Sequence, residues 1–502
     1  MHSNLCPEPA TTNSHTFKVM IEDAPVDALP QRSTEVTLSG SLGTLDIVFT
    51  VLAYNAPLTV ITGYVPLILA KGNGLGAPIT FLVAGGIIAL FAVGFSTMSK
   101  HVPNASAFYA YIAAGLGKPF GLGSAFVAIL AYALMMIGIY LYGGVVYGFL
   151  AKEVLGHSPL LWWQWSLILW VVVSVLGYLR ISFSAKVLTY ALIMEVLLVF
   201  GWEIAILVHK GFEGISPSWL SASNVTSGSL GVAILLGVGS YAGFEATAIF
   251  REEARSPETT VPRATYLAII VMTATFASAA YFMICGYGPQ QALARATQDP
   301  SVMTMNSMRM FLGRAGLEAV NTLVCSSVFA CLLALHNILS RYIYSLGVDG
   351  TLPKSLAAVH SRYGSPYRAS VLVSLVGVSC IAITMIGAVE PFAWYGILSG
   401  AGGYCLLLLQ ILTSLSIIAF FRHQHRTIGR WRTLYAPIAS TIALVATGWL
   451  ATTNLDLLTG SAQSIVILPV AVMAFLMVGI VYAMRLRKTR PAVYRAIGRQ
   501  KI

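Results

Sequence analysis

Twelve apolar stretches, joined by short polar connections, constrain the fold of this chain more than any other feature. Only 10% of the residues are charged and 57% are hydrophobic, whereas soluble chains carry about 25% charged residues. Each stretch is long enough to cross a bilayer, which takes about 20 helical residues. Because lipid cannot hydrogen-bond a backbone, we predict an all-α polytopic membrane protein. The predicted helices cover residues 41–70, 77–99, 120–150, 161–179, 184–208, 229–251, 264–287, 317–346, 369–389, 391–421, 434–452 and 463–484.

The basic residues indicate which side of the membrane each connection faces. With a cytoplasmic N-terminus, 24 of the 30 Lys and Arg residues fall in cytoplasmic segments. Positively charged connections stay on the cytoplasmic side, so both termini are predicted to be cytoplasmic. The net charge of +11 is then a matter of topology and lipid head groups, and we expect no nucleic-acid partner.

Two of the stretches are interrupted at a similar depth. The first break is Tyr54-Asn55-Ala56-Pro57, and the second break is Ser240-Tyr241-Ala242-Gly243, just after Gly237 and Gly239. An unwound segment at mid-membrane survives only inside protein or beside a water-filled cavity. Matching interruptions in two halves of a chain indicate a substrate site between inverted repeats, as in secondary transporters.

Each break is expected to expose backbone groups of both polarities. The half-helix that begins at Pro57-Leu58-Thr59 would present free N–H groups and the positive end of its dipole, which suit a carboxylate. The carbonyl groups of Tyr54, Gly239 and Ser240 would suit an ammonium group, so the site fits an amino acid. The alternative is that Pro57 only kinks a continuous helix; two breaks at symmetric depth favour the site. The predicted substrate-binding residues are Tyr54, Asn55, Ala56, Pro57, Leu58, Thr59, Gly239, Ser240, Tyr241 and Gly243.

Several strings resemble those of a known family. Gly243-Phe244-Glu245, continued by residues 252–257 and 260–264, resembles the sixth-helix signature of the amino acid–polyamine–organocation (APC) permeases, of the bacterial amino acid permease type. Residues 103–111 resemble their first cytoplasmic loop, and residues 336–342 and 349–353 resemble the end of their eighth helix. The resemblance implies a leucine-transporter-type fold, in which two inverted repeats of five helices carry discontinuous helices 1 and 6.

This chain departs from the family pattern in two places. Residues 55–60 (Asn-Ala-Pro-Leu-Thr-Val) replace a Gly-Ser-Gly-like motif and resemble a branch that includes putrescine importers. The substrate class therefore stays open between amino acids and polyamines. Glu195 stands where sodium-independent members often place a Lys, so the role of that lysine is not carried over.

The helix pattern and the resemblance together predict four regions in a bacterial inner-membrane protein, a monomer or homodimer. Six cysteines show neither metal spacing nor a disulfide framework and are expected to fill packing positions. No signal peptide is expected, because no basic segment followed by an apolar run begins the chain. The regions are a disordered cytoplasmic tail (1–38), a ten-helix transport core (39–421, with repeats at about 39–210 and 225–421), two peripheral helices (422–485) and a basic cytoplasmic tail (486–502).

Charged residues inside the spans are expected to have a partner or a function. Glu245 lies beside the second break and is the leading candidate for a coupling proton; the alternative is that it bonds N–H groups of its own unwound helix. Glu195 is the second candidate, with a buried carboxyl bonding a neighbouring helix as the alternative. His336 is expected to be a packed, hydrogen-bonding side chain. Phe244 and Trp394 are predicted gate residues.

We therefore predict a secondary active transporter for amino acids that works by alternating access with proton coupling. The rival within the same fold is an importer of polyamines or other organic cations, which would need deep acidic groups such as Glu245 and Glu195. Ser326 and Ser327 raise a sodium site as an alternative to protons. No nucleophile–base pair or metal cluster is visible, so we expect no enzyme activity, cofactor or metal; a non-transporting membrane sensor is a remote alternative.

Overall fold

The computed structural model describes residues 43–102, 107–179, 185–211, 217–249, 254–422 and 428–498. The predicted disordered tail (1–38) lies outside these ranges, as do Glu252, Glu253 and the last residues of the predicted basic tail. Within the described residues the structure is all-helical.

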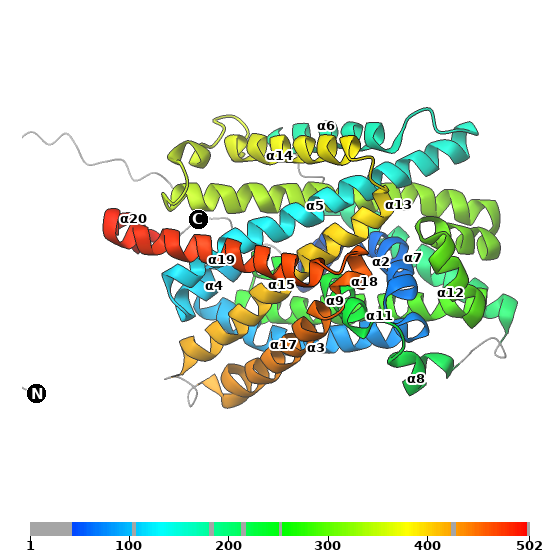
Figure 1. The fold of residues 1–502 in the computed structure, drawn as a ribbon, viewed down its shortest axis with the longest axis horizontal. Coiled ribbons are helices and arrows are strands. Elements are labelled where there is room, and N and C mark those ends of the chain that lie inside the picture. The colour runs from blue at the N-terminus through cyan, green and yellow to red at the C-terminus, as the bar shows by residue number, and fades with distance from the viewer. Residues whose placement is uncertain are drawn as a thin grey trace, which may run out of the picture. The chain divides into compact units, whose positions relative to one another are not determined.

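The helices follow the predicted stretches closely (Figure 1). Short 3-10 turns join some of them, at η1 (Gly74–Gly76), η3 (Pro217–Leu220), η5 (Pro300–Val302) and η6 (Lys354–Ala357), and η7 (Trp431–Tyr435) is a π-helical turn. The α-helices are α1 (Thr44–Asn55), α2 (Pro57–Lys71), α3 (Ala77–His101), α4 (Ala107–Gly115), α5 (Lys118–Leu155), α6 (Trp162–Leu179), α7 (Ala185–Lys210), α8 (Ala222–Val225), α9 (Leu230–Gly239), α10 (Ala246–Ile249), α11 (Pro257–Tyr287), α12 (Pro289–Gln298), α13 (Met303–Val348), α14 (Tyr367–Ile386), α15 (Pro391–Phe421), α17 (Ala436–Thr452), α18 (Leu455–Thr459), α19 (Ser464–Thr489) and α20 (Pro491–Ala496).

Membrane-spanning helices dominate the described part of the chain. Ten of them are long and apolar enough to cross a bilayer, and α1 with α2 forms a further span that is bent by 44°. The shorter apolar helix α9 continues through turns into α10, which completes the second interrupted stretch. All twelve predicted stretches are thus present as helices or as pairs of half-helices.

Three connections differ from the prediction. Residues 107–115, expected in a loop, form α4, and the connection between the predicted helices 264–287 and 317–346 contains the short helix α12. The same connection holds the first residues of α13. Gly313 has non-helical backbone angles (φ 68°, ψ −157°), which separate the segment that begins at Met303 from the span predicted to begin at residue 317. Residues 486–496, expected in a tail, are helical as the end of α19 and as α20.

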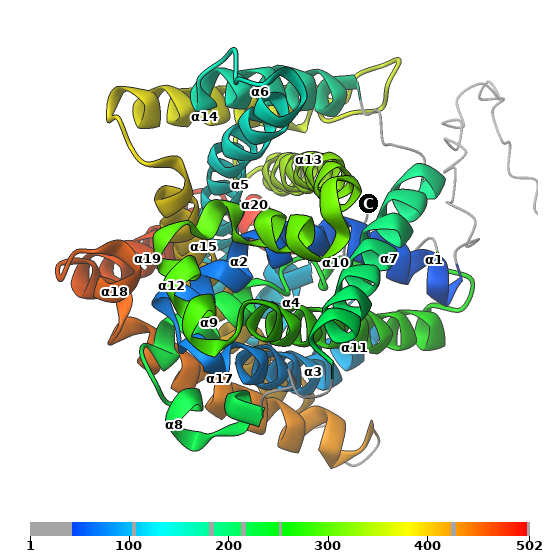
Figure 2. The same cartoon turned by 90° about the vertical axis from the view of Figure 1, so that its right-hand side faces the viewer.

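The interrupted helices lie inside the bundle. Helices α1, α2 and α9 contact α3, α7, α11, α13 and α15 in various pairs, while α6 and α14 pack side by side in both views (Figures 1 and 2). Small residues allow this packing: a Cβ on Gly402 of α15 would collide with Met135 of α5, and one on Gly479 of α19 would collide with Gly123. Close backbone approach of this kind is typical of helices in lipid.

Candidate functional site

The first break is a true interruption between two helices. Ala56 adopts the left-handed conformation (φ 54°, ψ 70°), and its N–H closes α1 by bonding to the carbonyl oxygen of Leu52 at 3.0 Å. Pro57 then starts α2 at the position where its missing N–H costs nothing. The 44° bend and the left-handed residue exclude a kink within one continuous helix.

The second break covers residues 240–245 as a series of turns. The N–H groups of Tyr241, Ala242 and Phe244 bond to carbonyl oxygens three residues earlier, at 3.1 to 3.2 Å. Gly243 has a φ of 103°, a conformation that favours glycine. The chain returns to α-helix only at Ala246.

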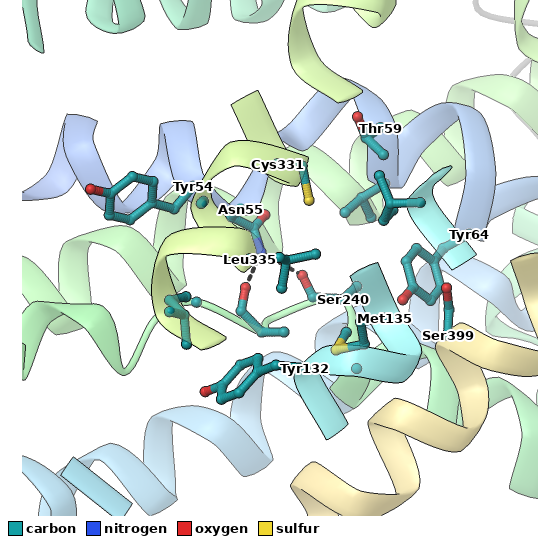
Figure 3. A pocket seen from close by; sticks show the side chains of 17 residues that line it. Tyr54, Asn55, Thr59, Tyr64, Tyr132, Met135, Ser240, Cys331, Leu335 and Ser399 are labelled. Atoms are coloured by element: carbon teal, nitrogen blue, oxygen red, sulfur yellow. Dashed lines mark hydrogen bonds between the residues drawn. The ribbon is translucent and has the colours of Figure 1, made fainter. Parts of the chain in front are cut away.

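One side chain joins the two breaks. Asn55 is 6% exposed, and its Nδ2 donates to the carbonyl oxygens of Ser240 at 2.7 Å and Ala242 at 3.0 Å (Figure 3). Its Oδ1 has no hydrogen-bond partner among the described residues. Asn55 therefore ties the end of α1 to the unwound backbone of the other interrupted helix and leaves one acceptor unused.

A pocket of about 50 Å³ lies between the breaks and the helices around them (Figure 3). Among the described residues, none that line it carries a charged side chain. It is lined by Tyr54, Asn55, Thr59, Val60, Tyr64, Tyr132, Met135, Ile139, Gly239, Ser240, Ala242, Gly243, Cys331, Ala334, Leu335, Ile338 and Ser399.

The structure brings most of the predicted site residues to this pocket. Ala56, Pro57 and Leu58 form the break without lining the pocket. No local pattern marks the contributions of α5, α13 and α15, because their lining residues are apolar, aromatic or small side chains inside long spans. The predicted residues that line the pocket are Tyr54, Asn55, Thr59, Gly239, Ser240 and Gly243.

Tyr241 and Trp394 do not line the pocket, and their predicted roles stay predictions. The hydroxyl of Tyr241 bonds to the carbonyl oxygen of Phe81 at 3.0 Å and to Thr273 Oγ1 at 2.9 Å, which fixes the ring among α3 and α11. Trp394 is 39% exposed and lies on the surface of α15, away from the pocket lining. Phe244 is fully buried and packs edge-on against Phe91 of α3.

The N–H groups at the start of α2 are occupied, contrary to expectation. The N–H of Leu58 donates to Glu195 Oε2 at 3.1 Å, and the N–H groups of Thr59 and Val60 bond to the carbonyl oxygen of Ala56. Ser327 of α13 donates to the same carboxyl oxygen at 3.2 Å. The carboxyl group of Glu195, on α7, thus bonds to the backbone N–H group at which the sequence predicts a substrate carboxylate.

Glu245 does the same at the second break. Its Oε2 accepts the N–H of Gly243 at 3.0 Å, and its Oε1 accepts the hydroxyl of Tyr132 at 2.5 Å. Both Glu195 and Glu245 are 5% exposed. The bond to Gly243 is the structural role foreseen as the alternative for Glu245, and the bonds of Glu195 to α2 and α13 match its alternative.

Other buried polar groups lie away from the pocket. His336 bonds through Nε2 to Ser370 Oγ at 2.9 Å, as expected of a packed side chain. Ser326 bonds within its own helix, to the carbonyl oxygen of Leu323. Glu203 of α7, which the sequence analysis missed inside its apolar run, is 4% exposed and accepts the hydroxyl of Ser278 at 2.7 Å.

An aromatic cluster closes one side of the pocket. The rings of Tyr142 and Tyr395 stack at 4.7 Å, and Tyr64 meets Tyr395 edge-on at 5.9 Å. The hydroxyl of Tyr142 donates to Thr62 Oγ1 at 2.7 Å. These contacts join α2 to α5 and α15 on the side of the first break toward Lys71.

Comparison with known proteins decides the family. A model described as amino acid permease matches residues 47–494. The chain belongs to the amino acid permease family. Members of this family are multi-pass membrane transporters and not enzymes.

Relatives of this permease have different substrates in their names. It is 24% identical to the branched-chain amino acid permease of Lactococcus lactis over 71% of this chain and 77% of that one. It is 22% identical to the low-affinity putrescine importer of Escherichia coli over the same shares, 71% and 77%. An uncharacterized transporter of Mycobacterium bovis is 34% identical over 158 residues, which are 32% of this chain and only 35% of that relative's length.

The fold of the permease is also found among solved structures. The crystal structure of MhsT in complex with L-phenylalanine aligns with a TM-score of 0.58 at 14% identity, covering 82% of this chain and 99% of that one. The fold is therefore of the leucine-transporter type, as the sequence predicts.

Proposed function

We propose that this permease is a proton-coupled secondary transporter for an organic amine, which crosses through the pocket between the breaks by alternating access. The observation that carries the proposal is that the chain's own carboxyl groups already accept backbone N–H groups at both breaks. Glu195 accepts the N–H of Leu58, and Glu245 accepts the N–H of Gly243. A carboxylate on the substrate would have to displace a tethered one, whereas an amine has no such competitor.

The pocket offers groups that suit a protonated amine. Asn55 Oδ1 is a buried acceptor without a partner among the described residues, and Thr59 Oγ1 is another. Glu245 lies directly behind two lining residues, since it bonds to Tyr132 and Gly243. Placing a charged carboxylate inside the membrane costs free energy unless a positive charge or a proton neutralises it. A proton-coupled amine transporter supplies both, the charge on the amine and the coupling proton.

Amino acid transport, the leading prediction from the sequence, is the second candidate. Its support is the family description and the similarity to a branched-chain amino acid permease. In that case the substrate carboxylate has to replace Glu195 or Glu245 at a backbone N–H during the cycle. The apolar lining from α5 and α13 would then contact the side chain of the amino acid.

Pairs of ligands that differ only by a carboxylate distinguish the two candidates. We suggest ornithine against putrescine and leucine against isoamylamine, measured by the thermal unfolding of purified protein and by competition for uptake into proteoliposomes. A ligand at 100 times its Kd stabilises the folded state by about 2.7 kcal/mol. We expect at least one amine to stabilise the protein and its amino acid partner to have no effect. Stabilisation by an amino acid, with none by its amine, would overturn the proposal in favour of the second candidate.

A further inference from the structure

The C-terminal segment, residues 491–498, docks on the bundle although the sequence suggests a tail. Ile497 is 1% exposed, and Val493 and Tyr494 are half-buried against the core. The segment lies at the end of α19, beside the end of α13 and the start of α5 (Figure 1). This is the face that the distribution of basic residues predicts to be cytoplasmic.

A cluster of three hydrogen bonds among Tyr109, Asp349 and Gly498 holds the end of the segment. The N–H of Gly498 donates to the hydroxyl of Tyr109 at 2.9 Å and to Asp349 Oδ2 at 3.4 Å, and the Tyr109 hydroxyl donates to the same carboxyl oxygen at 2.5 Å. Gly498 has a φ of 72°, and a Cβ there would lie 2.8 Å from the Cβ of Ala113. Three elements therefore meet at one glycine: α4, the end of α13 and the C-terminal segment.

A second group of contacts holds the middle of the segment. The Lys118 ammonium group, at the first position of α5, donates to the carbonyl oxygen of Arg495 and lies 5.4 Å from the centre of the Tyr494 ring. The methyl groups of Val493 approach Gly350, the residue after Asp349. Together, the two groups of contacts involve residues 109 and 349–350, which belong to the segments that resemble the first cytoplasmic loop and the end of the eighth helix of the family.

Aromatic contacts continue from α4 to the second break. Phe108 and Tyr111, which flank Tyr109, pack against Phe95 of α3 with ring centroids 5.9 and 5.3 Å away. Phe95 in turn packs against Phe244 at 5.8 Å. Phe244 stands between Gly243 and Glu245, the two residues whose bond caps the second break.

We propose that the C-terminal segment is an intramolecular latch that stabilises the second break through α4. When the segment is docked, the Tyr109–Asp349–Gly498 hydrogen bonds fix α4 in place. α4 in turn holds Phe95 and Phe244 in their present packing. When the segment is released, α4 is freed, and the unwound backbone at residues 240–245 opens more often. Contiguous packing shows that coupling between the segment and the second break is possible, but does not demonstrate it. The coupling is demonstrated if releasing residues 491–498 also increases the opening of residues 240–245.

Hydrogen exchange tests the latch without a substrate, so its result is independent of the proposed function. Tyr109→Phe removes the shared hydroxyl and keeps the ring, and Tyr435→Phe, at a 51% exposed position of η7, is the matched control. A lost hydrogen bond to a charged group shifts an opening equilibrium about tenfold or more. We expect Tyr109→Phe to speed exchange about tenfold in residues 491–498, in α4 and in residues 240–249, and Tyr435→Phe to leave all three unchanged.

Two outcomes of the Tyr109→Phe measurement would overturn the latch. If exchange rises in residues 491–498 but stays unchanged in residues 240–249, the segment is docked without being connected to the break. If exchange in residues 491–498 does not change, the hydrogen bonds of Tyr109 do not hold the segment. A truncation after Thr489 provides the second variant: it should speed exchange in residues 240–249 to at least the same extent, and an unchanged rate there would equally reject the proposal.

Discussion

Three buried carboxyl groups distinguish this permease at the level of single residues. Glu195, Glu203 and Glu245 are each 5% exposed or less within the described part of the spans. Glu195 and Glu245 bond to backbone N–H groups at the two breaks, whereas Glu203 accepts the hydroxyl of Ser278 of α11. Their different neighbours assign them different expected roles.

Glu245 is expected to carry the coupling proton. A glutamine there keeps the shape of a protonated carboxyl but cannot release a proton, so Glu245→Gln should retain counterflow exchange and lose accumulation driven by a pH gradient. Glu203→Gln is the matched control, because Glu203 touches neither break, and it should keep gradient-driven uptake. Uptake into proteoliposomes with an imposed pH gradient measures both.

Undiminished gradient-driven uptake by Glu245→Gln would remove this residue as the proton site. Glu195→Gln should retain more of the coupling than Glu245→Gln, since Tyr132 connects only Glu245 to the pocket. Uptake that follows a sodium gradient at fixed pH would discard proton coupling altogether.

Asn55 is expected to be the most sensitive uncharged residue of the site. Asn55→Asp replaces a donor by an acceptor that faces two carbonyl oxygens, so the contact becomes repulsive. Loss of a buried hydrogen bond with an unsatisfied partner costs about 1–3 kcal/mol, and we expect a lower midpoint of thermal unfolding.

Asn454→Asp controls for the change of charge. Asn454 also donates to a backbone carbonyl, that of Leu450, but at a half-buried position where water can replace the bond. Equal thermal stability of Asn55→Asp and the parent would show that the tie between the breaks contributes little.

At the scale of elements, the breaks follow from local sequence and their occupants do not. Pro57 begins a new helix and Gly243 takes a positive φ, both through their own backbone preferences, so the positions of both breaks are predictable. The bond from Leu58 to Glu195 joins residues 137 positions apart. No local pattern reveals it, and this is why the start of α2 was expected to be free for a substrate carboxylate.

The first break is expected to require Pro57 and Asn55. Replacing both by Ala supplies the missing N–H and removes the tie to Ser240 and Ala242, so α1 and α2 can join into one helix. We expect strongly weakened ligand binding with near-normal insertion, measured by thermal shift and by the yield of monodisperse protein. Pro66→Ala is the control, because Pro66 already lies inside the helical part of α2.

If the double variant binds ligand as strongly as the parent protein, the substrate site does not lie at the first break. The loss of binding in Pro66→Ala as well would show that α2 responds to any proline replacement, and the effect would then say nothing specific about the break.

At the scale of the molecule, hydropathy and the position of prolines were enough to predict the helices, and the solved structures confirm the fold type. The helix α4 was missed because Pro103 and Asn104 precede it in a string that reads as a loop. The docked C-terminal segment was missed because its basic residues suggest a solvated tail, whereas Val493, Tyr494 and Ile497 contact the bundle. The boundaries of the two repeats stay a prediction.

The orientation in the membrane is a prediction for the whole molecule. The excess of Lys and Arg on one face predicts that both termini are cytoplasmic. A cysteine introduced near Thr489 should react with a membrane-permeant reagent only, and one introduced in α12 should react with an impermeant reagent added to intact cells. The reverse pattern would invert the topology, and with it the side on which the C-terminal segment docks.

The backbone of Ala56 has a consequence for the balance between states of the cycle. A left-handed conformation costs a residue other than glycine about 1–2 kcal/mol, and this cost exists only while α1 and α2 are separate helices bent at Ala56. Any state in which Ala56 regains right-handed geometry is favoured by that difference, a factor of about 5–30 in population. Alanine at this position therefore acts as a fixed bias on the conformational equilibrium, and glycine there would remove the bias without altering a single side-chain contact.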